Sequence, residues 1–304
     1  MNRRDFVRAA GAALPLAGCA PAALAPAEAQ TPAGPVLETA GPVMAGPLRA
    51  PSFRHSVCRW PFSGWPLDTL CGVAADLGIA SVELVQPADA PVLARHGLTC
   101  AMTAHPDAAV DALRKGWNRA AHHEWLVPAY RRQLAATADA GWPNLIVFSG
   151  NRDGLDDATG LETMARGIEQ ILPDAERLGV TLCIELFNSK VDHPDYQADS
   201  TAWGLALVER LGSPRFKILY DIYHMQIMEG DVIRTVTDHL DAIAHVHTAG
   251  VPGRHEIDES QELFYPAIMR ALDAAGFDGF VAQEFIPTGD PRAALADAIA
   301  RCTV

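Results

Sequence analysis

The stretch Leu219-Tyr-Asp-Ile-Tyr-His-Met-Gln-Ile-Met-Glu-Gly-Asp231 is the most informative part of the chain for its architecture. The apolar run 216–220 predicts a buried strand, so Asp221 and His224 follow at the point where that strand emerges into a loop. From residue 232 onward, apolar residues recur at helical spacing. The order is therefore strand, polar loop and helix, which in α/β proteins places polar groups at the carboxyl edge of a parallel sheet.

Working outward in both directions, short apolar runs alternate with longer helix-like segments from residue 54 to the C-terminus. Eight runs have the length and composition of buried strands: 56–59, 81–85, 99–102, 144–148, 181–186, 216–221, 243–248 and 279–285. Helical patterns separate many of them, at 67–77, 124–140, 161–178, 201–211 and 265–275. Eight β/α units without a surplus predict a closed (β/α)8 TIM barrel, in one α/β domain over residues 51–304, rather than an open doubly wound sheet. A dinucleotide site is not indicated, because no Gly-x-Gly-x-x-Gly turn follows the first strand.

Residues 1–30 are expected to be an export signal rather than part of the fold. Arg3-Arg4-Asp5-Phe6, followed by an Ala/Leu/Gly run, is typical of a twin-arginine (Tat) signal, and the run is too short and broken to span a bilayer permanently. Leu16-Ala-Gly-Cys19 resembles a lipobox, which would place a lipid on Cys19, whereas Ala27-Glu-Ala29 offers ordinary cleavage. The alternative is an Ala-rich tail kept in the cytoplasm. Residues 31–50 are expected to be a Pro/Ala-rich linker. Because of the export signal, we expect a periplasmic protein, either lipid-anchored or free.

The net charge limits the classes of binding partner, and the cysteine spacing indicates the state of the thiols. The net charge of −13 opposes nucleic acid as a partner. Five cysteines beyond Cys19 are widely spaced and include no Cys-x-x-Cys pair, so we expect buried thiols rather than a disulfide framework. These cysteines are Cys58, Cys71, Cys100, Cys183 and Cys302.

Each of the last four predicted strands ends in or near a side chain that can bind a divalent cation. These residues are Glu185, Asp221, His247 and Glu284, and their separations of 36, 26 and 37 residues each approximate one β/α unit. In a barrel, all four would face one another at the carboxyl rim. One imidazole and three carboxylates suit one Mn²⁺, Mg²⁺, Co²⁺ or Zn²⁺ ion with room for substrate oxygens. A single such residue is more often a helix cap, but four in consecutive units predict a metal site.

A cation at this rim would acidify the carbon-bound hydrogen of an α-hydroxycarbonyl compound. Glu185 and Glu284 would flank it, since their strands lie three apart, and could remove and return the proton to give the isomeric carbonyl compound. His245, on the same strand face as His247, is expected behind the metal. Glu83 either contacts the site or pairs with Arg59.

Five further residues are candidate substrate contacts. His224 would reach a substrate oxygen or make a structural hydrogen bond. Arg254, with His255 beside it, would hold a substrate carboxylate by a two-pronged contact. Lys190 and Arg152 are further anion contacts, each with loop scaffolding as the alternative, whereas the alternative for Arg254 is a surface ion pair. Trp60 is expected to wall the pocket.

Several of these segments together resemble the hydroxypyruvate isomerase family of the xylose-isomerase-like TIM-barrel superfamily. The matching segments are Phe148-Ser-Gly-Asn-Arg152, Glu185-Leu-Phe-Asn-Ser-Lys-Val-Asp-His193, the stretch 219–231, His247-Thr-Ala-Gly-Val-Pro-Gly-Arg-His-Glu256 and Ala282-Gln-Glu-Phe285. The resemblance implies a divalent metal at the four residues above, with the two glutamates as acid/base pair. It also implies interconversion of hydroxypyruvate and 2-hydroxy-3-oxopropanoate, or of a similar small hydroxy-oxo acid. It allows a homo-oligomer, although no segment indicates an interface.

Other functions remain open from the sequence. Better-known members of this family carry Gln at the position of His247, whereas related ketose 3-epimerases carry His, so a ketose 3-epimerase using the same metal site is the alternative enzyme. A non-catalytic periplasmic binding protein for a sugar or sugar acid is the alternative of another class. A DNA-repair nuclease would need more metal ligands and a basic groove, which the acidic charge opposes.

Overall fold

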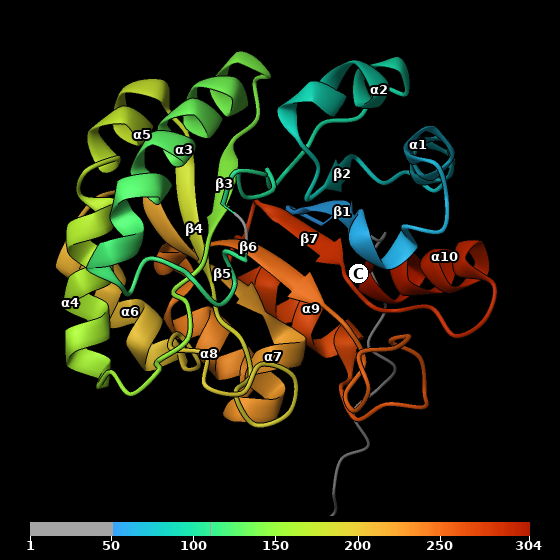
Figure 1. Cartoon of the computed structure of the whole chain (residues 1–304). Helices are drawn as coiled ribbons and strands as arrows, with labels where there is room; N and C mark the ends of the chain where they lie inside the picture. Colours follow the sequence, from blue (N-terminus) through green and yellow to red (C-terminus); the bar gives the residue numbers. More distant parts are fainter. Residues whose placement is uncertain (1–50, 110) are drawn as a thin grey trace, which may run out of the picture. The chain divides into compact units, whose positions relative to one another are not determined.

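The computed structural model describes residues 51–109 and 111–304 (Figure 1). The predicted export signal, the lipobox at Cys19 and the linker at 31–50 lie outside the described residues. Within the described part, seven parallel strands form one curled sheet in the order β2-β1-β7-β6-β5-β4-β3. They are β1 Arg54–Cys58, β2 Ser81–Glu83, β3 Asn144–Val147, β4 Thr181–Glu185, β5 Phe216–Asp221, β6 Ile243–Thr248 and β7 Phe280–Gln283.

The predicted strand at 99–102 is an irregular segment that fills the eighth place of the barrel. Thr99 forms a parallel bridge with Ser81 of β2, and Thr103 forms one with Leu145 of β3. Between these bridges, side chains take the hydrogen bonds of Ala101: its N–H donates to Ser81 Oγ at 2.8 Å, and its carbonyl accepts from Asn144 Nδ2 at 2.8 Å. The segment therefore joins β2 to β3 without forming a regular ladder.

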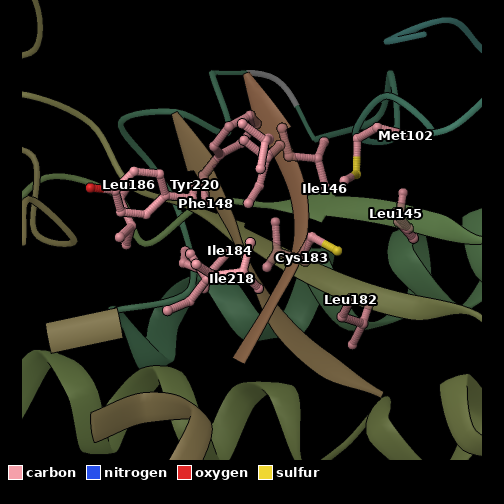
Figure 2. Close-up of a cluster of buried hydrophobic side chains, with 14 of the residues drawn as sticks. Met102, Leu145, Ile146, Phe148, Leu182, Cys183, Ile184, Leu186, Ile218 and Tyr220 are labelled. Atoms are coloured by element: carbon pink, nitrogen blue, oxygen red, sulfur yellow. The ribbon is translucent and has the colours of Figure 1, made fainter. Parts of the chain in front are cut away.

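The strands are buried on both faces, as expected for a parallel sheet covered by helices. All five residues of β4 are buried, and apolar side chains of β3, β4 and β5 pack together in the cluster of Figure 2. The labelled members on these three strands are Leu145, Ile146, Leu182, Cys183, Ile184, Ile218 and Tyr220. This packing fixes the carboxyl ends of adjacent strands side by side.

Ten α-helices flank the sheet among the described residues (Figure 1). They are α1 Leu67–Asp76, α2 Ala90–Arg95, α3 Ala120–Asp139, α4 Asp157–Ile168, α5 Leu172–Leu178, α6 Thr201–Leu211, α7 Ile222–Met228, α8 Val232–Asp238, α9 Tyr265–Ala274 and α10 Pro291–Cys302. The helix expected at 161–178 is divided into α4 and α5, because Pro173 occupies the first turn of α5 and has no N–H to continue the hydrogen bonding of α4. In the described part, no helix combines the length and apolarity needed to cross a bilayer.

The five cysteines of the described residues are all buried and unpaired. Burial raises the pKa of each thiol, including that of Cys71, which rises to about 11. The prediction of buried thiols rather than a disulfide framework is therefore confirmed for these residues.

Candidate metal centre and substrate cavity

The fold brings the four predicted metal ligands together at the carboxyl ends of β4 to β7. Glu185 ends β4, Asp221 ends β5, His247 lies in β6 and Glu284 directly follows β7. Each is at most 2% exposed, and one donor atom from each lies within 4.8 Å of the other three. His247 Nδ1 lies 3.0 Å from Glu284 Oε2 and 3.3 Å from Glu185 Oε1. Such a compact set of three carboxylates and one imidazole is a donor set for a divalent cation.

The two carboxylate oxygens of Asp221 make different contacts: one caps a helix and the other faces the cluster. Oδ1 accepts the main-chain N–H of Tyr223 at 2.8 Å and that of His224 at 3.3 Å, so it caps the N-terminus of α7. Oδ2 faces the cluster, 3.4 Å from Arg254 Nη2. The helix cap and the metal ligand are therefore compatible roles, and the cap fixes the orientation of the oxygen that faces the cluster.

The charge balance of the cluster fits a bound cation. Arg254 Nη2 contacts Glu284 Oε2 at 2.6 Å, yet Glu185 Oε1 is buried and accepts no hydrogen bond, although His247 Nδ1 is 3.3 Å away. Burial raises the pKa of Asp221 to about 8 against the opposing charge of Arg254, and burial also raises the pKa of Glu185. Burial opposes ionisation of Glu284 too, but His247 and Arg254 outweigh it and lower its pKa. Buried carboxylates of this kind are stabilised by coordinating a metal.

A fourth buried carboxylate, Glu83 at the end of β2, lies behind His247. Its Oε1 is 2.9 Å from His247 Nε2 and 2.8 Å from His245 Nε2, and its Oε2 accepts Ser56 Oγ at 2.5 Å. Burial alone would raise the pKa of Glu83, but the two histidines outweigh it and hold the pKa at about 2. An ionised carboxylate only accepts hydrogen bonds, so His247 donates Nε2–H to Glu83. Burial lowers the pKa of His247, but Cys58 and Glu284 outweigh it and raise that pKa well above its ordinary value, so Nδ1 would give up its proton on binding a metal.

This arrangement resolves the two alternatives for Glu83. Arg59 donates instead to the main-chain carbonyls of Phe62 and Trp65, both at 2.8 Å. His245 lies behind the metal ligands, as the sequence indicated.

His224 offers a hydrogen-bond donor to the same cluster. Its Nδ1 accepts both the main-chain N–H of Asn188 at 3.1 Å and the Asn188 side-chain amide at 2.7 Å. Burial lowers the pKa of His224 well below its ordinary value, so the ring is neutral and the proton is on Nε2. That atom is buried without a hydrogen-bond partner, 3.5 Å from Asp221 Oδ2. Its N–H is therefore directed at the cluster, and His224 itself is fully buried.

A cavity of about 380 Å³ adjoins the cluster and exposes part of it to a ligand. Its lining residues are Trp60, Leu84, Ala104, His105, Leu113, Ile146, Phe148, Glu185, Phe187, His193, Arg254 and Glu284. Trp60, expected as a wall, also donates Nε1–H to Glu284 Oε1 at 2.7 Å. Sequence reasoning did not find Phe187 or His193 as walls, because it treated their loop as a source of polar contacts.

Four of the five predicted substrate contacts are not among the residues that line this cavity. One is His224, described above, and the other three are Lys190, Arg152 and His255. Lys190 Nζ donates to the carbonyls of Ile227 and Met228, at 3.1 and 2.9 Å, at the C-terminal end of α7. Arg152 pairs with Asp157 and Asp199. His255 Nδ1 is 3.0 Å from the carbonyl oxygen of Ile286. The structure places all three in contacts that hold loops, whereas Arg254 lines the cavity and His224 faces the cluster.

Comparison with known proteins agrees with the fold. The family described as xylose isomerase-like TIM barrel matches residues 71–303. The 2-oxo-tetronate isomerase of Cupriavidus necator is 36% identical over 138 residues, or 45% of this chain and 51% of the relative. A human relative named for hydroxypyruvate isomerase is 34% identical over 107 residues, or 35% of this chain and 39% of that protein. The chain thus spans about half or less of these curated relatives. The 2-oxo-tetronate isomerase of Pectobacterium atrosepticum matches more widely, at 29% identity over 71% of this chain and 85% of the relative.

Solved structures show the same architecture. A protein from Brucella melitensis described as an AP endonuclease of family 2 has a TM-score of 0.69 and 27% identity, covering 82% of this chain and 98% of that chain. An L-ribulose 3-epimerase has a TM-score of 0.67 at 20% identity, covering 82% of this chain and 92% of that one, a likeness of fold. With the family match over residues 71–303, these comparisons establish that the chain belongs to the xylose isomerase-like TIM barrel family.

Proposed function

We propose that this protein is a divalent-metal-dependent isomerase that interconverts hydroxypyruvate and 2-hydroxy-3-oxopropanoate, or a similar small hydroxy-oxo acid. The observation that carries the proposal is the convergence of Glu185 and Glu284 on one cavity, with Asp221 and His247 completing a buried donor set. The names of the curated relatives, 2-oxo-tetronate isomerase and hydroxypyruvate isomerase, support the same class of reaction.

The metal would be held by Glu185, Asp221, His247 and Glu284 and, when bound, would supply polarisation of the hydroxyl and carbonyl oxygens of the substrate. One glutamate of the pair Glu185 and Glu284 removes the proton from the hydroxyl-bearing carbon. The proton is returned to the neighbouring carbonyl carbon by this pair, while the hydroxyl proton passes to the former carbonyl oxygen. His224 Nε2–H donates to a substrate oxygen as charge develops on it. The product is the isomeric hydroxy-oxo acid.

Arg254 favours an acid over a neutral sugar as substrate. It is the one permanent cation among the described residues that line the cavity, and its guanidinium is directed at Glu284 and Asp221. Metal coordination of these carboxylates would release the guanidinium to hold a substrate carboxylate in a two-pronged contact. A ketose 3-epimerase would use the same proton transfer on a longer, neutral substrate, and His247 as fourth ligand is the feature that favours it.

Proton NMR in D₂O tests the proposal directly. The purified protein is loaded with Mn²⁺, Mg²⁺ or Co²⁺ in turn and incubated with hydroxypyruvate, and spectra are taken after chelation and removal of protein. We expect metal-dependent formation of 2-hydroxy-3-oxopropanoate, lost in Glu284→Gln. Glu256→Gln is the matched control, because Glu256 follows the same strand as His247 but accepts hydrogen bonds from Thr288 outside the cavity.

The outcomes separate three functions. No turnover of hydroxypyruvate or 2-oxo-tetronate by the metal-loaded protein would contradict an acid isomerase. Turnover of ketose sugars under the same conditions would then identify an epimerase. Sugar-acid binding that survives chelation, without turnover of either class, would identify a binding protein.

A further inference from the structure

The lining of the cavity changes character away from the metal ligands. Beside Glu185, Glu284 and Arg254, half of the lining residues are aliphatic or phenylalanine: Leu84, Ala104, Leu113, Ile146, Phe148 and Phe187. All lining residues belong to the described part of the chain, and none has a hydroxyl or amide side chain. The lining is therefore charged at Glu185, Glu284 and Arg254 and mostly apolar elsewhere, where His105 and His193 supply ring nitrogens.

The two histidines in the lining extend the apolar surface. His193 stacks on Phe187, with ring centroids 4.3 Å apart and an interplanar angle of 17°. Burial lowers the pKa of His193, so the ring is neutral at neutral pH. The ring of His105 lies edge-on to Phe148 at 5.8 Å, and its Nδ1 is 3.1 Å from the carbonyl oxygen of Pro106. His193 thus extends the aromatic surface of Phe187, while its ring nitrogens and His105 Nε2 can still hydrogen-bond to a ligand.

Cavity size and lining together disfavour two kinds of substrate. A cavity of about 380 Å³ lies within the range of about 300–1,000 Å³ that is typical of pockets for ligands much larger than a three-carbon acid, so such an acid would leave part of it to water. A longer, fully hydroxylated ketose would fill it but would bring several hydroxyl groups against Leu84, Ile146 and Phe187. Hydroxyl groups that lose water without gaining a partner weaken binding.

We propose that the preferred substrate is an α-hydroxy-oxo acid whose hydroxyl-bearing carbon carries an alkyl or aryl group, of the form R–CH(OH)–CO–COO⁻. This inference rests on the proposed isomerase function. The group R packs against Phe148, Phe187 and Ile146, while the hydroxyl, carbonyl and carboxylate groups lie at Glu185, Glu284 and Arg254. The product is R–CO–CH(OH)–COO⁻: the carbon-bound proton moves to the neighbouring carbon and the hydroxyl proton to the other oxygen, so no oxidant or reductant is required.

The first measurement uses unreactive ligands and is independent of turnover. Titration calorimetry of the metal-loaded protein compares pyruvate, 4-methyl-2-oxopentanoate and phenylpyruvate, which share the oxo-acid head and differ in R. Each buried methylene strengthens binding about fourfold, so we expect the two larger acids to bind at least tenfold more tightly than pyruvate. Equal affinities would overturn the inference even if hydroxypyruvate is isomerised.

The second measurement compares kcat/KM for hydroxypyruvate, 2-oxo-tetronate and 3-hydroxy-2-oxo acids with isobutyl or phenyl groups on the hydroxyl-bearing carbon. We expect at least a tenfold preference for the substituted acids over both smaller substrates. Ala104→Leu should fill part of the cavity and reduce this preference at least tenfold. The same substitution at Ala158, which is exposed on α4, should leave the preference unchanged.

The possible failures are distinguishable. If kcat/KM for hydroxypyruvate or 2-oxo-tetronate equals that for the substituted acids, the isomerase function stands and the preference for an apolar substituent is contradicted. If the large oxo acids bind tightly but no hydroxy-oxo acid reacts, the apolar chamber stands and the isomerase function is contradicted.

Discussion

Single residues determine how the cluster presents its donors. The convergence of the four rim residues could be predicted from the sequence, because each lies at the end of a successive apolar strand and chain order fixes their place around a barrel. The contact of Glu83 with His245 and His247 joins residues more than 160 positions apart, and only the folded chain brings them together. Residue type also suggested Lys190 and Arg152 as anion contacts, but charge does not encode side-chain direction, and both are held in loops.

Glu83→Gln should weaken metal binding, since His247 would lose the ionised acceptor that orients its ring. Replacing such partners of a metal-binding histidine typically costs about 10- to 100-fold in metal affinity. The affinity is measured by Mn²⁺ titration against a chelating dye. Ser56→Ala, which removes a hydrogen bond to the other oxygen of Glu83, serves as the control and should have a smaller effect. An unchanged Mn²⁺ affinity in Glu83→Gln would show that Glu83 only supports the fold.

Arg254→Met should raise KM for an acid substrate at least tenfold in the metal-loaded enzyme, because the substrate carboxylate would lose its charge-assisted partner. Steady-state kinetics with hydroxypyruvate measures this change. Arg254→Lys should recover only part of the loss, since an ammonium group cannot make a two-pronged contact. Equal KM values for the three proteins would place the carboxylate elsewhere.

At the scale of elements, seven strands could be predicted from apolar runs in the sequence. These strands are buried on both faces of the sheet, so most of their residues are apolar. The segment 99–103 has the same composition but is no regular strand, since Ser81 and Asn144 take the hydrogen bonds of Ala101. Side-chain competition of this kind is not visible in a hydrophobic pattern. The break between α4 and α5 could have been predicted, because Pro173 lies at it.

Asn144→Leu should destabilise the closure between β2 and β3, because the carbonyl of Ala101 would lose a buried donor. We expect the free energy of unfolding to fall by about 1–3 kcal/mol in denaturant titrations. Amide exchange at Leu84 and Thr103, which bond across this segment, should accelerate. Unchanged exchange at these amides would show that the closure does not depend on Asn144.

At the scale of the whole molecule, one ion would tie together four neighbouring strands, β4 to β7. Binding to the folded state alone contributes about 2.7 kcal/mol when the free metal is at 100 times Kd. For a domain of this size the Tm should rise by roughly 5–10 °C. Scanning calorimetry with and without chelator measures the shift, and Glu284→Gln should reduce it. A metal-independent Tm would contradict a resident ion.

The proposed export also concerns the whole molecule, and the residues that would direct it lie outside the described part. Replacing Arg3 and Arg4 by Lys should retain the protein in the cytoplasm, since a Tat-type signal is read through its paired arginines. Cell fractionation measures the distribution. Cys19→Ala separates the two processing routes: release from the membrane indicates a lipid on Cys19, and no change indicates simple cleavage.

The burial of the four donor residues bears on which metal ion the protein acquires in the cell. These residues are at most 2% exposed, so an ion held by them would exchange through the adjoining cavity, which a bound substrate would occupy. If exchange by this route is slow, a chain exported in its folded form would carry outward whichever ion the cytoplasm supplied, whatever the abundance of competing metals outside. Elemental analysis of the native protein would then report the compartment in which the chain folded, and refolding in the presence of Zn²⁺ would yield a different occupant.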